Sequence, residues 1–293
     1  MADFLQQVVA GLASGGVYGS LALALVLIYR STRVINFAQG EMATCSTYIA
    51  WSLLNHGMPY WAAFFLTLAI SFVGGVAIER IVIRPVEGAS VLTNVIITLG
   101  LALLVNGLTT VIWGTGIKQI RSAFPTRPIH VGGVAFSIQD IGITGVSIAA
   151  VVLLFALFQY TKTGLALRAA SFNPASSRLV GIRVGWMLAL GWGLAAVLGA
   201  VSGLLVAPVV FLDPNMMQTV LLYAFAAAIL GGLDSPIGAV VGGLALGVTL
   251  NLLGTYVGFV GATLRLPVAV ALILAVLLVR PAGLFGRVAV RRV

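Results

Sequence analysis

Charged residues are scarce in this sequence, and cysteine is almost missing. Aspartate, glutamate, lysine and arginine together make up 8% of its 293 residues, whereas 60% of the residues are hydrophobic. A soluble globule of this length needs more polar surface than that, so the composition excludes a water-soluble fold. The one cysteine, Cys45, excludes an intramolecular disulfide and a cysteine-based metal cluster.

Motifs for nucleotide binding and catalysis are also missing. The sequence has no GxxxxGK[ST] phosphate loop, no HExxH and no GxSxG. The segment GWGLAA at 191–196 resembles part of a dinucleotide fingerprint, but it falls within a predicted membrane helix rather than after a strand. Neither His56 nor His130 has a ligand partner nearby in the sequence. We therefore predict that this chain is not an enzyme and that it binds no metal or cofactor itself.

Acidic residues are few, and none is predicted at mid-membrane. Proton-driven transporters generally need a carboxylate at that depth, so we expect any energy to come from a partner. The acids fall at predicted helix ends or in loops: Asp3, Glu41, Glu79, Glu87, Asp140, Asp213 and Asp234. The net charge is +9, and most of the cations flank apolar runs. This is the positive-inside pattern of a membrane protein, so we predict contact with lipid and no nucleic-acid partner.

Nine apolar runs dominate the sequence. Most of them approach the roughly 20 residues that a membrane-spanning helix needs, and without a barrel pattern only helices satisfy their backbone in lipid. The runs predict an all-α, polytopic membrane protein of eight to ten transmembrane helices, with nine as the best value, in one domain over residues 1–293. They lie at about 6–29, 41–51, 61–79, 91–113, 141–160, 186–210, 219–232, 237–254 and 265–280.

The last third of the chain allows two topologies. The run at about 219–232 is short for a span, and GGLDSPIGAVVGG follows it at once. It predicts either a short crossing followed by another crossing, or a re-entrant hairpin. Two crossings place the cationic stretch at 162–184 on the same side as the cations at the end of the chain, Arg280, Arg287, Arg291 and Arg292. The positive-inside rule therefore favours two crossings, with the N-terminus outside and the C-terminus in the cytoplasm.

The stretch at 162–184 carries four cations and no acid. Each cation would cost roughly 2.5 to 3.5 kcal/mol at the centre of a membrane helix, so this stretch is predicted to emerge as a cytoplasmic loop. Within it, NPASSRLVG at 173–181 predicts a very short helix, with Asn173 as N-cap, Pro174 at the first helical position and Gly181 just past the end. Such a helix is unstable alone in water. Either it docks against a partner, or it packs on its own bundle.

Polar residues near predicted helix ends form a second group of candidates. Asn36 is predicted to cap the second helix, with Gln39 reaching back as in a capping box and Glu41 in the first turn. Alternatively these side chains line a pathway, because polar groups at membrane depth usually face a bundle interior or water. A pathway role or a bond between helices is also predicted for three polar residues of the fourth run, Asn94, Thr98 and Asn106.

Small residues mark two predicted packing faces. Gly11, Gly15 and Gly19 recur at four-residue intervals and therefore share one face of the first helix. Gly199 and Gly203 repeat this spacing in the sixth run. Because glycines let helix backbones approach closely, we predict that both faces are buried inside the bundle.

Four stretches, spread in order along the chain, are similar to one known family. They are INFAQGE at 35–41, RAASFNPASSRLVGI at 168–182, AFAAAILGGLDSPIGAVVGG at 224–243 and RPAGLFGR at 280–287. Together they resemble the LivH-type permeases of branched-chain amino acid ABC importers. Where members of that family commonly have a histidine before Gly-Glu, this chain has Gln39, which speaks against a protonation role at that position.

The resemblance implies a permease subunit in the bacterial cytoplasmic (inner) membrane that carries branched-chain amino acids, although permeases of this type also serve urea and short amides. It implies three kinds of partner: a second permease of the LivM type, two cytoplasmic ATPase subunits that hold ATP and magnesium, and an extracytoplasmic substrate-binding protein. An ATPase would engage the coupling loop through Arg168, Asn173, Pro174, Ala175, Ser176, Ser177, Arg178, Leu179, Val180 and Gly181.

Two rival readings of the chain belong to other functional classes. One is a channel or secondary carrier that acts alone, which predicts flux without ATPases. The other is a purely structural assembly subunit, which predicts that polar substitutions around Asn36 and Glu41 leave transport intact.

Overall fold

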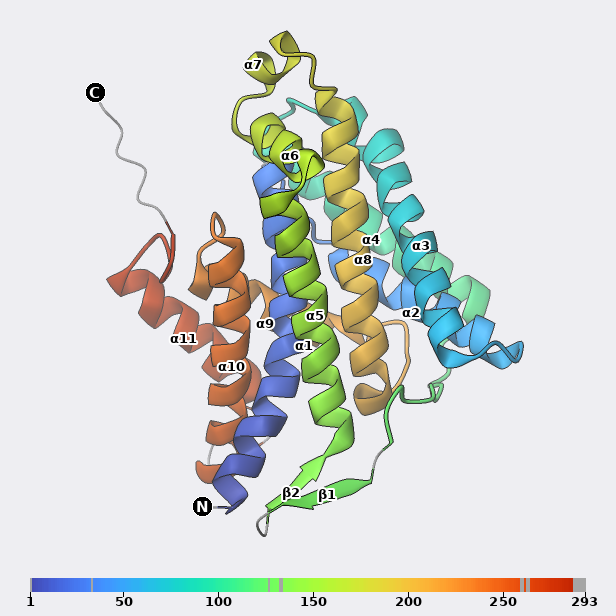
Figure 1. The fold of residues 1–293 in the computed structure, drawn as a ribbon, viewed down its shortest axis with the longest axis vertical. Coiled ribbons are helices and arrows are strands. Elements are labelled where there is room, and N and C mark those ends of the chain that lie inside the picture. Colours follow the sequence, from blue (N-terminus) through green and yellow to red (C-terminus); the bar gives the residue numbers. More distant parts are fainter. Residues whose placement is uncertain are drawn as a thin grey trace.

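The computed structural model describes residues 2–32, 34–125, 127–131, 134–258, 261 and 264–286. These residues form eleven α-helices, a π-helix followed by a 3-10 turn, and one β-hairpin (Figure 1). The helical fold class predicted from the sequence is confirmed.

In the described part of the chain, nine helices correspond to the nine apolar runs. They are α1 (Ala2–Thr32), α2 (Gln39–Asn55), α3 (Tyr60–Ile78), α4 (Val91–Trp113), α5 (Ile138–Tyr160), α8 (Val184–Val210), α9 (Met217–Gly231), α10 (Pro236–Tyr256) and α11 (Arg265–Val279). The remaining elements are the π-helix Glu79–Ile83, the 3-10 turn Arg84–Val86, the strands β1 (Pro128–Val131) and β2 (Val134–Ser137), and the helices α6 (Lys162–Phe172) and α7 (Pro174–Leu179).

Six helices are long and apolar enough to cross a membrane: α1, α3 with the turns that follow it, α4, α5, α8 and α10. Helices α9 and α11 are apolar but have 15 residues each, and α2 has 17. This count and these lengths refer only to the residues that the structure describes. The count of nine crossings and the orientation of the termini therefore stay predictions, and Arg287, Arg291 and Arg292 lie outside the described residues.

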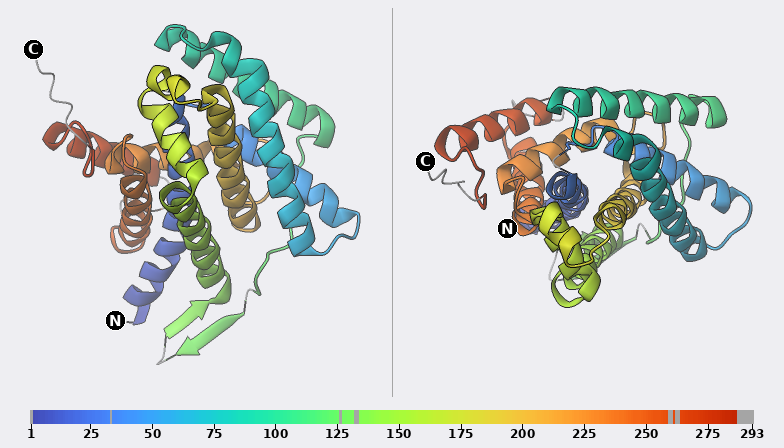
Figure 2. Two further views of the ribbon diagram at one scale, coloured as in Figure 1. Left: turned by 45° about the horizontal axis from the view of Figure 1, so that its top comes forward. Right: turned by 90° about the horizontal axis from the view of Figure 1, so that it is seen from above.

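Helix α1 runs through the centre of the bundle, with α5, α8, α9 and α10 around it (Figure 2). In its most apolar stretch of 18 residues, 83% of the residues are buried, whereas in the corresponding stretches of α4 and α5 only 17% are buried. Side chains such as Leu21, Ala22 and Ile28 have no exposed surface. Because α1 has protein on every side, it is apolar all round instead of along one stripe.

The glycines of α1 bring it against α10. A Cβ added at Gly15 would lie 2.8 Å from the carbonyl oxygen of Gly243, and a Cβ added at Gly247 would lie 2.4 Å from the Cα of Gly15. Gly11 and Gly19 make similar close approaches to the backbone of α10. Along this line, which we call the glycine seam, backbone packs directly on backbone.

The second pair of predicted packing glycines brings α8 against α2. A Cβ added at Gly199 would lie 2.7 Å from Nε2 of Gln39, and one added at Gly203 would lie 2.5 Å from Oγ1 of Thr47. The neighbours here are side chains as well as backbone, in contrast to the glycine seam.

The prediction that Asn36 caps α2 is wrong in detail. The helix begins at Gln39, its N-cap residue is Ala38, and no described side chain accepts a capping hydrogen bond there. Instead, Oδ1 of Asn36 accepts a hydrogen bond from the backbone N–H of Ala38 at 3.0 Å, and its Nδ2 donates to Oε1 of Gln39 at 3.1 Å. A local turn of this kind competes with capping for the same oxygen. Glu41 does lie in the first turn of the helix.

The paired strands β1 and β2 are not predicted from the sequence. Strands β1 and β2 pair antiparallel, with Ile129 opposite Phe136. They lie within the long connection between α4 and α5, at the end of the molecule opposite to α7 (Figure 1).

Candidate functional site

The short helix α7 lies at one extreme end of the molecule, beyond the neighbouring ends of α5 and α8 (Figure 1). Oδ1 of Asn173 accepts a hydrogen bond from the backbone N–H of Ser176 at 3.0 Å, and Pro174 occupies the first helical position, where its missing N–H costs nothing. Gly181 has a φ of 82°, a left-handed conformation that favours glycine. The chain turns there into α8.

Helix α7 and its flanks present apolar side chains to the outside. Leu179 is 89% exposed, Val180 is 76% exposed, and Phe172 just before the helix is 93% exposed. Arg178 beside them is exposed as well. We call Phe172, Arg178, Leu179 and Val180 the loop surface. Its cationic surroundings are unfavourable in hydrocarbon, and a group of exposed apolar side chains is typical of an interaction site.

Phe172 is exposed although it is not among the predicted contact residues, whereas two of the predicted residues, Arg168 and Ser177, are half-buried and buried. The signal for Phe172 was an aromatic residue within a cationic stretch. Ser177 is 4% exposed, so its side chain is not available to a partner. Arg168 lies on α6, where its Nη1 donates to Oε1 of Gln159 at 3.1 Å. The other assigned residues are exposed: Asn173, Pro174, Ala175, Ser176, Arg178, Leu179, Val180 and Gly181.

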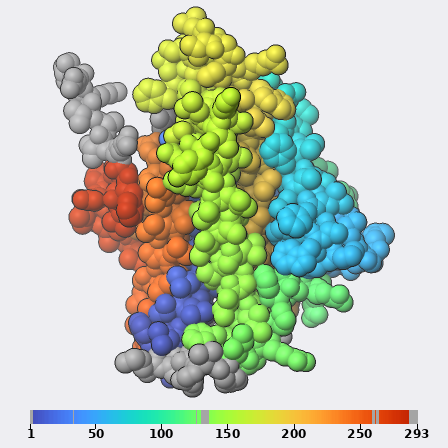
Figure 3. Space-filling view, viewed as in Figure 1, coloured from blue at the N-terminus to red at the C-terminus, as the bar shows by residue number. Residues whose placement is uncertain are grey.

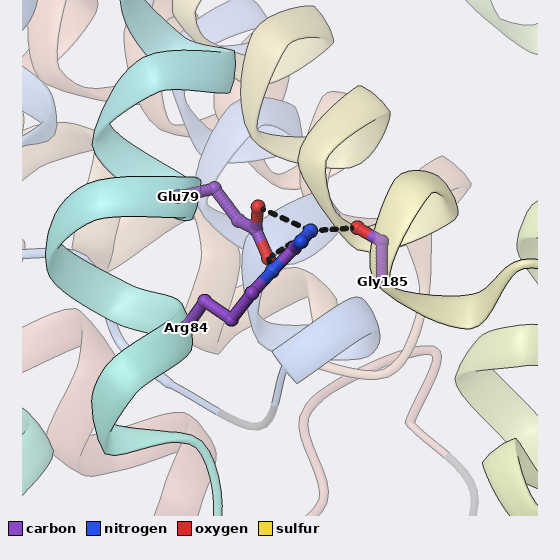
Figure 4. Close-up of polar contacts among 3 residues, drawn as sticks. All are labelled: Glu79, Arg84 and Gly185. Atoms are coloured by element: carbon purple, nitrogen blue, oxygen red, sulfur yellow. Dashed lines mark hydrogen bonds and ion pairs between the residues drawn. The ribbon is translucent and has the colours of Figure 1, made fainter.

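An ion pair between Glu79 and Arg84, in the turns that follow α3, is hydrogen-bonded to the start of α8 (Figure 4). Nη2 of Arg84 lies 3.0 Å from Oε2 of Glu79, and it also donates to the carbonyl oxygen of Gly185 in the first turn of α8. Next to this pair the guanidinium of Arg80 lies 4.6 Å from the ring centre of Trp186, which adds a cation–π contact between the same two elements. We call Glu79, Arg84 and Gly185 the clasp. Gly185, the member of the clasp on α8, directly follows the coupling loop at 162–184 in sequence.

One candidate pathway residue, Gln39, holds α2 onto α8, and a second, Asn36, is bonded to Gln39. Gln39 has no exposed surface, and its Nε2 donates to the carbonyl oxygen of Ala195 in the middle of α8 at 2.9 Å. Asn36, also fully buried, donates to Gln39 as described above. Both side chains therefore find partners inside the bundle.

A polar cluster lies where α2 and α4 meet the segment after α8. Nδ2 of Asn106 lies 2.9 Å from Oε2 of Glu41, 3.0 Å from the carbonyl oxygen of Pro214 and 3.1 Å from Oδ1 of Asn215. An amide group has two hydrogens, so these three acceptors share two donors. Oδ1 of Asn215 also accepts from Nε2 of Gln218 at 2.9 Å. Glu41 is 8% exposed, whereas Asn215 and Gln218 are exposed, so the cluster runs from the interior to the surface.

The structure separates the other two candidates on α4 from this polar cluster. Oγ1 of Thr98 donates to the carbonyl oxygen of Ile35 at 3.2 Å, which ties α4 to the segment before α2. Asn94 is half-buried, and no described hydrogen bond joins its side chain to the cluster.

Helix α8 connects all of these features. It starts at the clasp, offers the carbonyl oxygen of Ala195 to Gln39, and leads into the segment that carries Pro214 and Asn215. One helix of 27 residues therefore connects the end of the coupling loop with the segment of the polar cluster. Among the residues that the structure describes, no group of three or more His, Cys, Asp and Glu side chains could hold a metal ion.

Comparison with known proteins gives consistent results. The family model described as branched-chain amino acid transport system / permease component matches residues 7–279. The high-affinity branched-chain amino acid transport system permease protein LivH of Escherichia coli K12 is 29% identical, over 99% of this chain and 98% of LivH. BraD of Pseudomonas aeruginosa, described in the same words, is 30% identical over the same shares.

A relative from an archaeon is similar as well. The probable branched-chain amino acid transport permease protein LivH of Methanocaldococcus jannaschii is 32% identical, over 91% of this chain and 87% of that protein. With a family match over nearly its whole length and six helices of membrane-spanning character, this chain belongs to the permease component family of branched-chain amino acid transport systems.

Proposed function

We propose that this chain is the permease subunit of an ABC importer that moves branched-chain amino acids across the bacterial inner membrane. Its relatives are permeases of branched-chain amino acid transport systems. The observation that supports an ATP-driven mechanism is the loop surface, where Leu179 and Val180 stand exposed on a capped helix outside the membrane-length helices. A chain without a phosphate loop needs a partner to supply energy, and this surface offers that partner a place to bind.

The proposed partners are a second permease of the LivM type, two cytoplasmic ATPase subunits and an extracytoplasmic substrate-binding protein. ATP and magnesium would be bound by the ATPases. In the apolar stretches of α4 and α5 that could span a membrane, only 17% of the residues are buried. This leaves apolar faces for lipid and for the second permease.

Closure of the ATPases would push α7 against the bundle. Because the clasp fixes the start of α8 to the end of α3, both helices would move together. Movement of α8 would then shift Pro214 and Asn215 relative to Asn106 and Glu41, where we place the pathway. The ATPases bias the two states only through contacts that differ between them, and those contacts would be made at the loop surface.

The test compares the chain alone with the complete transporter, using leucine as the probe. The chain purified alone in liposomes should take up no leucine, whereas the complex with its ATPases and binding protein should take it up only with ATP. Leucine flux through the chain alone would overturn the proposal in favour of a channel or carrier. If the complex takes up urea or a short amide with ATP but does not take up leucine, the chain is a permease subunit but the proposed substrate is wrong.

A further inference from the structure

A groove lies between α5 and α10. These two helices stand side by side on one face of the molecule and cover most of α1 (Figure 3). Between them is a cavity of about 580 Å³ that opens on the outer face, a size typical of ligand sites. Its floor is formed by Leu23 and Leu27 of α1, and its walls include Phe155 of α5 and Val241 of α10.

One end of this groove is cationic. Arg30 near the end of α1, Gln159 near the end of α5 and Arg168 on α6 line it. Because Oε1 of Gln159 accepts from Nη1 of Arg168 at 3.1 Å, the guanidinium is held at the groove. Nε of Arg168 is buried and has no hydrogen-bond partner among the described residues. Buried N–H groups are nearly always paired, so an acceptor beyond the described residues would complete this site.

The cationic end lies on the side of the bundle where α6 and α7 emerge. The positive-inside rule assigns this side to the cytoplasm. The acceptor that reaches Arg168 therefore comes from the cytoplasmic leaflet or from the cytoplasm itself.

We propose that this groove binds one anionic phospholipid of the cytoplasmic leaflet, with an acyl chain along Leu23, Leu27 and Phe155 and the phosphate at Arg168. The apolar walls have no partners for a free phosphate ion, whereas they match an acyl chain. A guanidinium forms strong charge-assisted hydrogen bonds with phosphate, and basic pockets between membrane helices on the cytoplasmic side suit anionic head groups.

A helix of a second permease subunit is the competing occupant. It would cover the apolar walls, but an apolar helix brings no anion to Arg168. The charge at the end of the groove therefore favours lipid, and this distinction can be measured.

The experiment titrates the complete transporter, purified in detergent, with phosphatidylglycerol or phosphatidylcholine and counts bound lipid by native mass spectrometry. We expect phosphatidylglycerol to bind at least about tenfold more tightly than phosphatidylcholine, the ratio expected from charge-assisted hydrogen bonds. Arg168→Gln should remove this preference, and Arg168→Lys should retain most of it. The control Arg183→Gln changes the charge equally at an exposed position outside the groove and should leave the preference unchanged.

A second variant tests the groove itself. Val241→Trp places a large side chain in the groove, and it should reduce the bound phosphatidylglycerol while leaving Arg168 intact. Equal affinity of the wild type for both lipids, or an unchanged preference in Arg168→Gln, would overturn the proposal. So would a Val241→Trp complex that keeps its lipid but loses the second permease, because the groove would then be a subunit contact.

Discussion

Glu79 and Arg84 form an ion pair whose two partners differ greatly in exposure: the carboxylate side chain is 2% exposed and the guanidinium side chain 37%. Removing the arginine leaves a buried carboxylate without its cation. Removing the charge of Glu79 leaves a guanidinium that can turn towards water and still reach Gly185. The two halves of the clasp are therefore not equivalent.

We expect Arg84→Met to destabilise the chain by on the order of 3 kcal/mol, the usual cost of leaving a buried charge unpaired, and Glu79→Gln by only about 1 kcal/mol. Thermal unfolding in detergent measures the difference. Glu87→Gln, at an exposed acid nearby, is the control and should have no effect. A larger loss in Glu79→Gln than in Arg84→Met would show that the burial of the carboxylate does not decide the energetics.

The loop surface predicts a specific loss of coupling. Leu179→Asp changes a side chain that is 89% exposed, so the chain should fold normally, but the complex should lose about tenfold or more of its substrate-stimulated ATP hydrolysis, as expected for an apolar hot spot. Ile117→Asp is the matched control, because Ile117 is 74% exposed near the opposite end of α8, where Lys118 pairs with Leu212. If the two variants lose ATP hydrolysis equally, α7 has no specific role in coupling.

Two adjacent glycines of α3 provide a test of the packing against α8. A Cβ at Gly75 would lie 2.7 Å from the carbonyl oxygen of Trp192, whereas a Cβ at Gly74 would meet nothing within 4 Å. Gly75→Ala should cost about 1 to 3 kcal/mol through overpacking. Gly74→Ala should be neutral or stabilise the helix by up to about 1 kcal/mol. Unfolding midpoints of the two purified variants compare them directly, and similar midpoints would contradict the α3–α8 contact.

The polar cluster predicts unequal roles for two asparagines on α4. Asn106→Leu removes the donor to Glu41 and leaves its carboxylate buried, so leucine uptake by the complete transporter should fall by at least about tenfold. Asn94→Leu should have a much smaller effect, because no described hydrogen bond ties Asn94 to the cluster. Uptake is measured in proteoliposomes, with assembly of the complex checked for each variant. If the two variants lose uptake equally, the pathway does not follow the cluster.

Local patterns in the sequence predict much of the fold. Helix α4 begins and ends at the residues that its apolar run predicts, and α7 has the cap, the proline and the terminal glycine that its sequence predicts. These features depend on residues a few positions apart. Helix α6 was missed because its cations made the segment resemble a loop, although Thr161 caps it by accepting from the N–H of Gly164.

The contacts of the candidate site depend on residues that are distant in sequence. Arg84 reaches Gly185 across 101 positions and Gln39 reaches Ala195 across 156, and no local pattern specifies either bond. The capping box predicted at Asn36 is wrong for the same reason. The side chains of Asn36 and Gln39 are both able to cap a helix. In the structure, the amide of Gln39 instead bonds to α8, and Asn36 forms a turn.

The glycine seam predicts that parts of the chain differ in stiffness. Where backbone lies against backbone, no side chain can change its rotamer to admit a shift, so we expect α1 and α10 to move together. Helix α8 meets α2 partly through side chains such as Gln39 and Thr47, which can exchange partners. We therefore expect a change of access to involve the contact between α8 and α2 rather than the glycine seam.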